Sequence, residues 1–265
     1  MIVVTGATGN VGRPLVEALT AAGEQVRAVS RNATGFPADL SEPETLKPAL
    51  DGADAVFLLT SADFLANGNL ADVMDVVRGA GVQRVVLLSS QGVGTQRHPS
   101  GLEDAVRASG LAWTMLRPGN FASNAFQWAE SIRTRRQLEA PYGDVALPAV
   151  DPADIAEVAA VVLREPGHAG AIYTLTGPEP ISPRQQAAAI GEAIGEPVQF
   201  VELSRADARS RMLTYMPEPV VEATLGVLGE PTADEQRVRP DIERVLGRPA
   251  RPFAEWATRN APAFK

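Results

Sequence analysis

The chain begins with the stretch Met1-Ile-Val-Val-Thr-Gly-Ala-Thr-Gly-Asn-Val-Gly12, a short apolar run followed by three glycines at three-residue spacing. Residues Ile2–Val4 are all β-branched and apolar, which is typical of a buried strand in a parallel sheet. An amphipathic helix pattern formed by Val11, Leu15 and Leu19 begins inside the glycine turn. Glycines at this spacing let the backbone approach a pyrophosphate and let the first helix pack closely on the strand. A glycine triplet alone is typical of any tight turn, but the strand before it and the helix after it favour a dinucleotide-binding turn.

Strand-like and helix-like segments alternate along the following residues. Strands are predicted at Val26–Ser30, Ala55–Leu59, Val85–Leu88, Ala112–Leu116 and Ile172–Leu175, and helices at Pro43–Leu50, Leu70–Ala80, Leu102–Ala108, Ala153–Leu163 and Phe253–Asn260. The helix at residue 43 is expected to begin through Ser41, with Glu44 completing a capping box. This alternation predicts a Rossmann-type α/β fold, in which a doubly wound parallel sheet carries helices on its faces. After Gly177 the composition shifts towards helices separated by prolines.

Composition and charge exclude several classes of function. The chain has 265 residues, no cysteine and two histidines, His98 and His168, so we expect no disulfide, no thiolate catalysis and no metal site. The formal net charge of -8 and the pI near 4.9 disfavour nucleic acid as a partner. No apolar run approaches the length of a membrane span, and a strand begins at residue 2, so we expect a cytoplasmic protein without a signal peptide or a membrane partner. A monomer or a small homo-oligomer is the plain expectation.

The residues that end the second predicted strand bear on the choice between NAD and NADP. In dinucleotide-binding folds an acid at this place accepts hydrogen bonds from the ribose 2′-hydroxyl, whereas a cation suits a 2′-phosphate. This chain has Ser30-Arg31 there and no carboxylate until Asp39. Arg31 can pair with a phosphate through its planar guanidinium, and Ser30 can add a hydroxyl donor. We therefore predict NADP(H) over NAD(H), with a solvated surface arginine as the alternative.

Several later motifs, together with the glycine turn, resemble one branch of a known family. They are Arg31 after the second strand, Thr114-Met-Leu-Arg-Pro-Gly-Asn-Phe121, Asp154-Ile-Ala156, Tyr173-Thr-Leu-Thr-Gly177 and Leu246-Gly-Arg-Pro-Ala-Arg-Pro-Phe-Ala-Glu-Trp256. Over nearly its whole length the chain resembles the NmrA-like atypical short-chain dehydrogenase/reductase family and is similar to its NADPH:quinone oxidoreductase-type members. The resemblance implies an NAD(P)-binding Rossmann domain over residues 1–177, with residues 120–149 contributing to a substrate lobe. Residues 178–265 would form that small C-terminal substrate lobe and a closing helix.

The resemblance also implies which residues contact a nicotinamide cofactor. Asp39-Leu40 would border the adenine, although an ordinary turn acid is a nearly equal alternative. Gly119–Phe121 would face the nicotinamide, with a turn glycine and a packed aromatic residue as the alternative. Thr60, Ser61 and Ser89 end predicted strands at the edge where open α/β sheets bind ligands. The expected cofactor-binding residues are Gly6, Thr8, Gly9, Asn10, Val11, Gly12, Arg31, Asp39, Leu40, Thr60, Ser61, Ser89, Gly119, Asn120 and Phe121.

The chain lacks the sequence pattern of the tyrosine–lysine pair on which many members of this superfamily depend. In that pattern a lysine follows the tyrosine by four residues, lowers the pKa of the tyrosine and anchors the ribose. The lysines of this chain are Lys47 and Lys265, and neither lies four residues after Tyr142, Tyr173 or Tyr215. The sequence therefore predicts a reaction that proceeds without this pair.

Without a strong acid, the chemistry of the product limits the acceptor. Reduction of a simple ketone creates an alkoxide whose conjugate acid has a pKa of about 16, so a positioned proton donor is valuable. A quinone gives a phenolate-like product, whose conjugate acid has a pKa of about 10, and water or a weak donor can protonate it. We therefore expect an NADPH-dependent reductase of a small, aromatic, quinone-like or conjugated carbonyl acceptor. The alternatives are a redox-sensing regulator that binds NAD(P) without turnover and a non-redox biosynthetic enzyme on the same fold.

Three residues are candidates for contact with the acceptor or for proton donation. Asn120 can donate a hydrogen bond to an acceptor oxygen. Gln91 and His98 lie in the segment where the tyrosine of related enzymes would be. His98 can supply a proton near neutral pH, but a surface histidine beside Pro99 is the favoured interpretation. The sequence leaves the catalytic residue unassigned.

Overall fold

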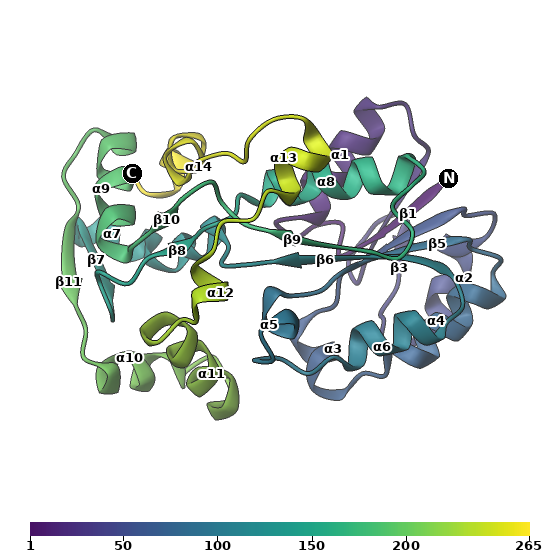
Figure 1. Ribbon diagram of the computed structural model, residues 1–265, viewed down its shortest axis with the longest axis horizontal. Helices are drawn as coiled ribbons and strands as arrows, with labels where there is room; N and C mark the ends of the chain where they lie inside the picture. Colours follow the sequence, from purple (N-terminus) through teal and green to yellow (C-terminus); the bar gives the residue numbers. More distant parts are fainter. The chain divides into compact units, whose positions relative to one another are not determined.

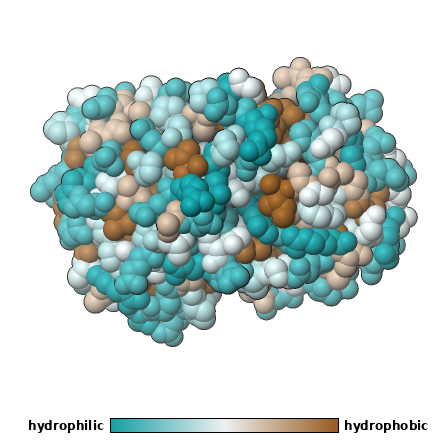
Figure 2. All heavy atoms as spheres, viewed as in Figure 1, coloured by the Kyte–Doolittle hydropathy of each residue, from teal (hydrophilic) through white to brown (hydrophobic). Residues whose placement is uncertain are grey.

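The computed structural model describes residues 1–265, apart from the side chain of Ala62, and divides into two compact units (Figure 1). The first unit consists of Met1–Pro118, Pro152–Leu175 and Asp241–Arg248, and the second of Gly119–Asp151, Thr176–Pro240 and Pro249–Lys265. None of the described helices combines the length and the apolar character that a membrane crossing requires. On the face drawn in Figure 2, apolar residues form small separate groups among hydrophilic ones.

The first unit is built around a seven-stranded parallel sheet with the strand order β3-β2-β1-β4-β5-β6-β9. Its strands are β1 (Ile2–Thr5), β2 (Val26–Ser30), β3 (Phe36–Pro37), β4 (Ala55–Leu58), β5 (Arg84–Leu88), β6 (Ala112–Pro118) and β9 (Ala171–Leu175). The strand order reverses at β1, which pairs with β2 on one side and with β4 on the other. Sheets of this kind bind ligands outside the carboxyl ends of the strands at such a reversal. The predicted doubly wound, Rossmann-type fold is confirmed.

Helices cover both faces of this sheet (Figure 1). On one face α1 (Gly12–Ala21) and α13 (Asp241–Leu246) both pack against α8 (Pro152–Arg164). The other face carries η1 (Pro43–Leu46), α2 (Lys47–Leu50), α4 (Leu70–Gly79) and α6 (Gly101–Ala108). Two short helices, α3 (Ala62–Asn67) and α5 (Gln91–Gly94), follow the carboxyl ends of β4 and β5. The sequence pattern predicts neither of these two.

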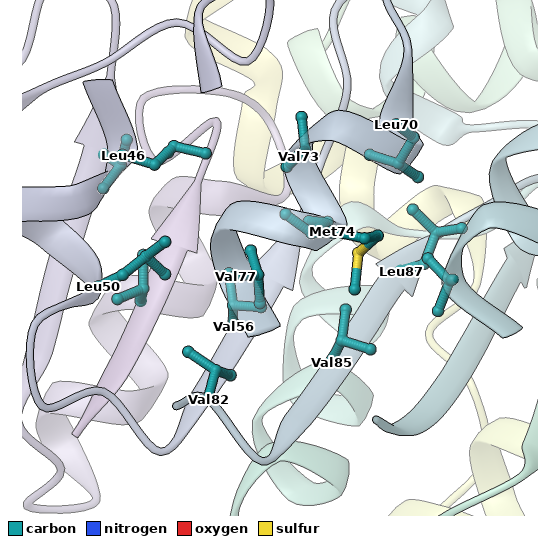
Figure 3. Packing of buried hydrophobic residues seen from close by; sticks show 14 of the residues in the cluster. Leu46, Leu50, Val56, Leu70, Val73, Met74, Val77, Val82, Val85 and Leu87 are labelled. Atoms are coloured by element: carbon teal, nitrogen blue, oxygen red, sulfur yellow. The ribbon is translucent and has the colours of Figure 1, made fainter. Parts of the chain in front are cut away.

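The core beneath α4 consists of interlocking aliphatic side chains (Figure 3). Val73, Met74 and Val77 recur at spacings of one, three and four residues, which places them on one side of α4. In Figure 3 Val77 lies beside Val56 of β4, and Met74 lies beside Val85 of β5. Each fully buried aliphatic side chain contributes roughly 1.5–3 kcal/mol. This packing fixes β4 and β5, whose carboxyl ends carry polar residues of the candidate site.

A segment near the end of the chain belongs to the first unit. Arg248, which follows α13, donates to the Asp154 carboxylate at 2.8 Å, and the Asp154 side chain is fully buried in α8. Loss of the arginine would leave a buried charge, which is strongly destabilising, so this ion pair holds α13 against α8. The two units divide the chain at several places, whereas the expected division is a single boundary after residue 177. Residues 120–149 lie in the second unit.

Two local predictions are corrected by the structure. Glu42, not Ser41, is the N-cap of η1, and no side chain caps that turn within the described part of the chain. A proline occupies the first helical position, where its fixed φ is favourable, while the Ser41 N–H donates to Asp39 Oδ1 at 2.9 Å. β6 continues to Pro118, two residues beyond its predicted end, because Arg117 and Pro118 pair with β9.

The second unit contains helices and two small sheets. One sheet pairs β7 (Gln137–Ala140) with β11 (Gln199–Glu202) in parallel, and the other pairs β8 (Leu147–Pro148) with β10 (Pro180–Ile181) in antiparallel fashion. The helices are η2 (Ala122–Trp128), α7 (Ala129–Arg135), α9 (Pro183–Ile194), α10 (Arg205–Met212), α11 (Glu218–Gly229), α12 (Ala233–Gln236), α14 (Phe253–Asn260) and η3 (Ala261–Ala263). The Trp256 ring of α14 lies 5.0 Å from the Phe126 ring and 5.3 Å from the Phe253 ring, at the centre of an apolar cluster. The predicted helix Phe253–Asn260 is confirmed.

A buried carboxylate connects the carboxyl ends of β5 and β6 in the first unit. The Glu103 side chain of α6 is 1% exposed and accepts hydrogen bonds from Arg117 Nε at 2.8 Å and Arg117 Nη2 at 2.7 Å. It also accepts from Arg107 Nη2 at 2.7 Å and from the Ser89 hydroxyl at 2.6 Å. Burial acts to raise the pKa of the Glu103 carboxyl, but the hydrogen bonds from Arg117 and Ser89 outweigh burial and lower that pKa below its ordinary value.

Glu103→Gln is expected to reduce stability in a pH-dependent way. Because the pKa of Glu103 is lowered in the folded chain, its stabilisation is complete above the pKa of an unfolded glutamate, about 4.3, and is lost as the pH falls through the folded value. We expect the free energy of unfolding to fall by roughly 3 kcal/mol at neutral pH and by much less in acid. Urea unfolding at both pH values measures this. Asp104→Asn, which changes an exposed acid of the same helix, should cost less than about 1 kcal/mol, and equal losses in the two variants would contradict the prediction.

Candidate functional site

The glycine turn between β1 and α1 is closely packed against its neighbours. Gly6 has a φ of +62°, and a Cβ there would lie 2.9 Å from Leu59 Cδ2. The Gly9 N–H donates to the Gly6 carbonyl oxygen at 3.0 Å. A Cβ at Gly12 would lie 2.1 Å from the same oxygen, so only glycine fits at the first residue of α1. The helix therefore begins directly against the end of β1.

Thr5 connects this turn to the end of β4. Its hydroxyl donates to the Phe57 carbonyl at 3.1 Å and accepts the Leu59 N–H at 2.8 Å. Thr5 is buried, so these bonds are shielded from competition with water. They fix the two central strands relative to each other at the reversal of strand order.

The N-terminus of α1 has the features of an anion-binding site. Val11 is its N-cap, no side chain caps it among the residues described, and its first turn contains no acidic residue. Thr8, Gly9 and Asn10 are exposed in the turn before it, as is Arg13 in its first turn. The backbone N–H groups and the dipole at such a helix end favour a phosphate. Gly12 has no side chain that would fill the space of the turn. The arrangement therefore fits the pyrophosphate of a dinucleotide.

Ser30 and Arg31, the residues expected to select NADP, lie at the end of β2 and directly after it. The Ser30 hydroxyl oxygen is buried and meets no hydrogen-bond partner among the described residues. Arg31 donates from Nη1 to Asp63 Oδ2 at 3.2 Å, and their side chains are 59% and 78% exposed. Sequence reasoning missed Asp63 because it missed α3. The available signal was Ser61, which caps that helix by accepting the Phe64 N–H at 3.2 Å.

The other residues expected near the adenosine also have roles within the fold. Asp39 stabilises its own turn through the Ser41 N–H, as the alternative interpretation holds, and Leu40 packs against the apolar core. Thr60 and Ser61 lie just beyond β4, after Leu59. The contacts of Asp39, Leu40, Thr60 and Ser61 with a cofactor stay predictions. The same holds for Ser89, whose hydroxyl donates to Glu103.

Gln91 and His98 lie in a compact loop after β5. Gln91 is buried and begins α5, a single helical turn that Ser90 caps. His98 is exposed, but its Nδ1 lies 3.0 Å from Ser90 Oγ. The sequence favours an ordinary surface histidine at residue 98. In the structure the His98 ring is paired with the Ser90 hydroxyl.

The other histidine and its tyrosine neighbour are paired with each other. His168 Nδ1 lies 2.8 Å from the Tyr173 hydroxyl, and burial, followed by the charge of Asp241, raises the pKa of Tyr173. This shift is opposite to the one that activates a catalytic tyrosine, so Tyr173 keeps its proton at neutral pH. No group of three metal-ligating His, Cys, Asp or Glu side chains occurs among the residues that the structure describes.

The second unit contains a cavity of about 700 Å³. Its lining includes the apolar side chains of Trp128, Leu203 and Met212 and the polar side chain of Asn120. Asn120 Oδ1 accepts a hydrogen bond from Asn124 Nδ2 at 2.9 Å, which orients the amide. Phe121 forms an isolated bridge with Val150. The lining also contains polar and charged side chains such as Gln186, Glu139 and Arg211, and a cavity of this size is typical of a small-molecule site.

Gly12→Ala is expected to weaken NADPH binding by more than about tenfold, or 1.4 kcal/mol. The reason is that the new Cβ would push α1 away from the Gly6 carbonyl. Isothermal titration calorimetry on protein shown by circular dichroism to be folded measures the affinity. Gly79→Ala is the matched control, because a Cβ at that helical position meets open space. An unchanged affinity in folded Gly12→Ala would contradict the prediction.

Comparison with known proteins gives matches over the whole chain. The NAD(P)H-binding family model matches residues 6–166. The chain is 38% identical to the (4-alkanoyl-5-oxo-2,5-dihydrofuran-3-yl)methyl phosphate reductase of Streptomyces griseus, over all of this chain and 99% of that protein. It is 34% identical to the NAD(P)H azoreductase of Xenophilus azovorans, again over all of this chain and 99% of the relative.

Solved structures agree with these matches. The NADPH-dependent quinone oxidoreductase of Escherichia coli, complexed with NADPH, is 25% identical with a TM-score of 0.79, and the match covers 98% of this chain and 99% of that one. The triphenylmethane reductase of a Citrobacter species, 22% identical with a TM-score of 0.81, shares the fold over 98% of this chain and 100% of its own. The chain therefore belongs to the NAD(P)H-binding family.

Proposed function

We propose that the chain transfers a hydride from NADPH to a quinone-like or other conjugated carbonyl acceptor, without a tyrosine–lysine pair. Its family and its whole-length relatives, which are named as reductases, make it an NAD(P)H-dependent oxidoreductase. The observation that carries the proposal is the glycine turn, where α1 meets the Gly6 carbonyl with no room for a side chain at the carboxyl edge of the sheet. Azo and quinone acceptors appear in the names of relatives, which supports a conjugated acceptor here.

The residues of the first unit suit NADP(H). When bound, NADPH supplies the hydride. The turn Gly6–Gly12 would hold the pyrophosphate, and Ser30 with Arg31 would hold the 2′-phosphate. The buried Ser30 hydroxyl supports this assignment because buried polar groups normally have a partner. The exposed Arg31–Asp63 pair is worth at most about 1 kcal/mol, so Arg31 can exchange Asp63 for a phosphate at little cost. The relative solved with NADPH supports the same choice.

The proposed class of acceptor rests on which proton-donating side chains the chain contains. Lys47 is paired with Glu44, Lys265 is the final residue, and the pKa of Tyr173 is raised. These side chains do not form a lysine-activated tyrosine, which is the proton donor that reduction of a simple ketone calls for. A quinone-like acceptor needs less help, because its reduced form is only as basic as a phenolate. The chain then has to position the acceptor and to shield it from water.

We assign the acceptor to the cavity of the second unit. Its apolar lining suits a flat aromatic or conjugated molecule, and Trp128 offers a ring for stacking. The Asn120 amide, whose oxygen accepts from Asn124, can donate to an acceptor oxygen through its Nδ2–H groups. These features support Asn120 as a contact residue for the acceptor.

The test is oxidation of NADPH and NADH by the purified protein with a panel of small quinones, an azo dye and a saturated ketone. We expect acceptor-dependent oxidation that prefers NADPH and favours the conjugated acceptors. Tight NADPH binding in calorimetry with no oxidation by any acceptor would overturn the proposal in favour of a regulator or a non-redox enzyme. A preference for the saturated ketone would overturn the acceptor class alone.

Substitutions at Arg31 and Asp63 test the choice of cofactor. Arg31→Ala should weaken NADPH binding by roughly 10- to 100-fold, the effect of a lost charge-assisted hydrogen bond, and should change NADH binding little. Asp63→Asn should strengthen NADPH binding by a few fold, because it removes an anion that holds Arg31 and repels a phosphate. Calorimetric titration of both variants with both cofactors provides the measurement. Equal loss of NADPH and NADH affinity in Arg31→Ala would refute the assignment.

A further inference from the structure

Gln186 places an amide on the buried side of α9. It lies four residues before Ile190 and eight before Ile194, so the three side chains share one side of the helix. Ile190 and Ile194 belong to the apolar core of the second unit, whereas Gln186 carries a polar group there and is only 6% exposed. Burial of an amide is unfavourable unless the amide is hydrogen-bonded. The position of Gln186 therefore needs an explanation beyond packing.

The neighbouring glutamine already completes the start of the helix. Gln185 Oε1 accepts the Ser182 N–H at 2.8 Å, and Ser182 Oγ accepts the Gln185 N–H at 3.3 Å. These two bonds form a capping box, which satisfies the free N–H groups at the first turn of α9. Gln186 contributes its backbone N–H, which donates to the Ser182 carbonyl at 2.8 Å. The side chain of Gln186 is not needed to begin the helix.

The Gln186 amide reaches the cavity of the second unit, whose lining includes this residue. Within the described part of the chain the amide makes no hydrogen bond. The side-chain polar atoms that are fully enclosed there without a partner are Ser30 Oγ and Arg239 Nε. The unpaired amide atoms of Gln186 are therefore not fully enclosed. For a side chain so deeply buried, the open space that they meet is the cavity.

The other polar groups of the lining limit the kind of ligand that fits. Arg211 donates to the Glu139 carboxylate, and because these opposite charges neutralise each other the lining favours a neutral ligand. The Asn120 amide oxygen accepts from Asn124, so Asn120 offers N–H donors. Gln186 keeps both its carbonyl oxygen and its NH₂ group, so it can accept from a hydroxyl or donate to a carbonyl. The lining thus suits a ligand with oxygen functions at two separate places.

The volume of the cavity indicates a ligand with more than one ring. A cavity of about 150 Å³ is enough to hold benzene, and this one measures about 700 Å³. We propose that Gln186 is a specificity-determining residue that binds a second oxygen function, a hydroxyl or a carbonyl, on a neutral conjugated acceptor of two or more rings. The inference rests on the function proposed above, because it concerns the acceptor of that reaction.

An unpaired amide in a closed site discriminates between similar ligands. A ligand that lacks the second oxygen leaves the Gln186 amide without a partner, or displaces water from it without replacing the hydrogen bond. Sites built to hydrogen-bond a ligand reject analogues without the matching group more strongly than apolar pockets reject an added group. The preference for an oxygenated ligand should therefore depend on this one side chain.

Two ligands and three proteins form a cycle that tests the proposal. The ligands are chalcone, a neutral conjugated enone with two rings, and dihydroxychalcone, which has a para-hydroxyl group on each ring. The proteins are wild type, Gln186→Met and Gln199→Met. Methionine matches the length of glutamine, is apolar and favours helices. Gln199→Met makes the same change at an exposed glutamine of β11 outside the lining. Calorimetric titration of each protein measures the affinities without turnover.

The preference for dihydroxychalcone over chalcone should be about tenfold larger in wild type and Gln199→Met than in Gln186→Met, as expected for one lost hydrogen bond. The thermal midpoint of Gln186→Met should be unchanged or higher, because the variant removes an unpaired buried amide. Equal preferences in wild type and Gln186→Met would overturn the proposal, as would an equal loss of preference in Gln199→Met. If Gln186→Met does not fold, Gln186→Leu provides the second apolar variant for the same cycle.

NADPH oxidation separates this inference from the proposed function. With the two chalcones as acceptors, the loss in Gln186→Met should appear in the KM for dihydroxychalcone, with kcat within about twofold of wild type, because a group that binds ground state and transition state equally affects KM. If wild type oxidises no NADPH with the chalcones or with quinones, the proposed function fails, while a binding preference that depends on Gln186 supports the ligand contact. If wild type is active and Gln186→Met matches it in preference and KM, the inference about Gln186 alone fails.

Discussion

The close approach of the first turn of α1 to the Gly6 carbonyl is the contact on which the first unit's chemistry depends. A Cβ at Gly12 would lie 2.1 Å from that oxygen, so helix and strand meet this way only because glycine stands there. The contact brings the N-terminus of α1 to the carboxyl edge of the sheet, where its N–H groups and dipole favour phosphate. Thr5 then ties the same turn to β4. Arg31 follows β2 and Ser90 follows β5, two strands of this sheet that have β1 and β4 between them, so both residues lie along the same carboxyl edge.

The sheet could be predicted from the sequence because parallel strands buried on both sides appear as continuous apolar runs. Ile2–Val4 and Val85–Leu88 are such runs, and both lie in observed strands. The short helices α3 and α5 could not be predicted in this way, since four to six residues are too few to show a helical repeat. Missing α3 concealed Asp63, and missing α5 concealed the role of Ser90 as its N-cap. In both places the signal for a helix was the N-cap residue, Ser61 or Ser90, and not a helical repeat of apolar residues.

Long-range charge pairing was also invisible in the sequence. Glu103 resembles a solvated acid near the start of an amphipathic helix, yet its side chain is 1% exposed because Arg117, Arg107 and Ser89 surround it. Arg117 lies beyond the predicted end of its strand, so nothing local connected the two residues. The cavity of the second unit was unpredictable for a related reason. Its lining comes from segments far apart in the chain, from Asn120 to Leu228, with no repeating pattern.

Isotope transfer tests hydride transfer by this protein most directly. NADPH carrying deuterium at the transferable C4 position, separately in each of its two stereochemical forms, would be mixed with the protein and a conjugated enone, whose product keeps the new C–H bond. Mass spectrometry of the product should show one deuterium from one form of the cofactor and none from the other. Oxidation of NADPH without deuterium in the product from either form of the cofactor would contradict direct hydride transfer. A protein that reduces neither the enone nor any quinone would contradict it as well.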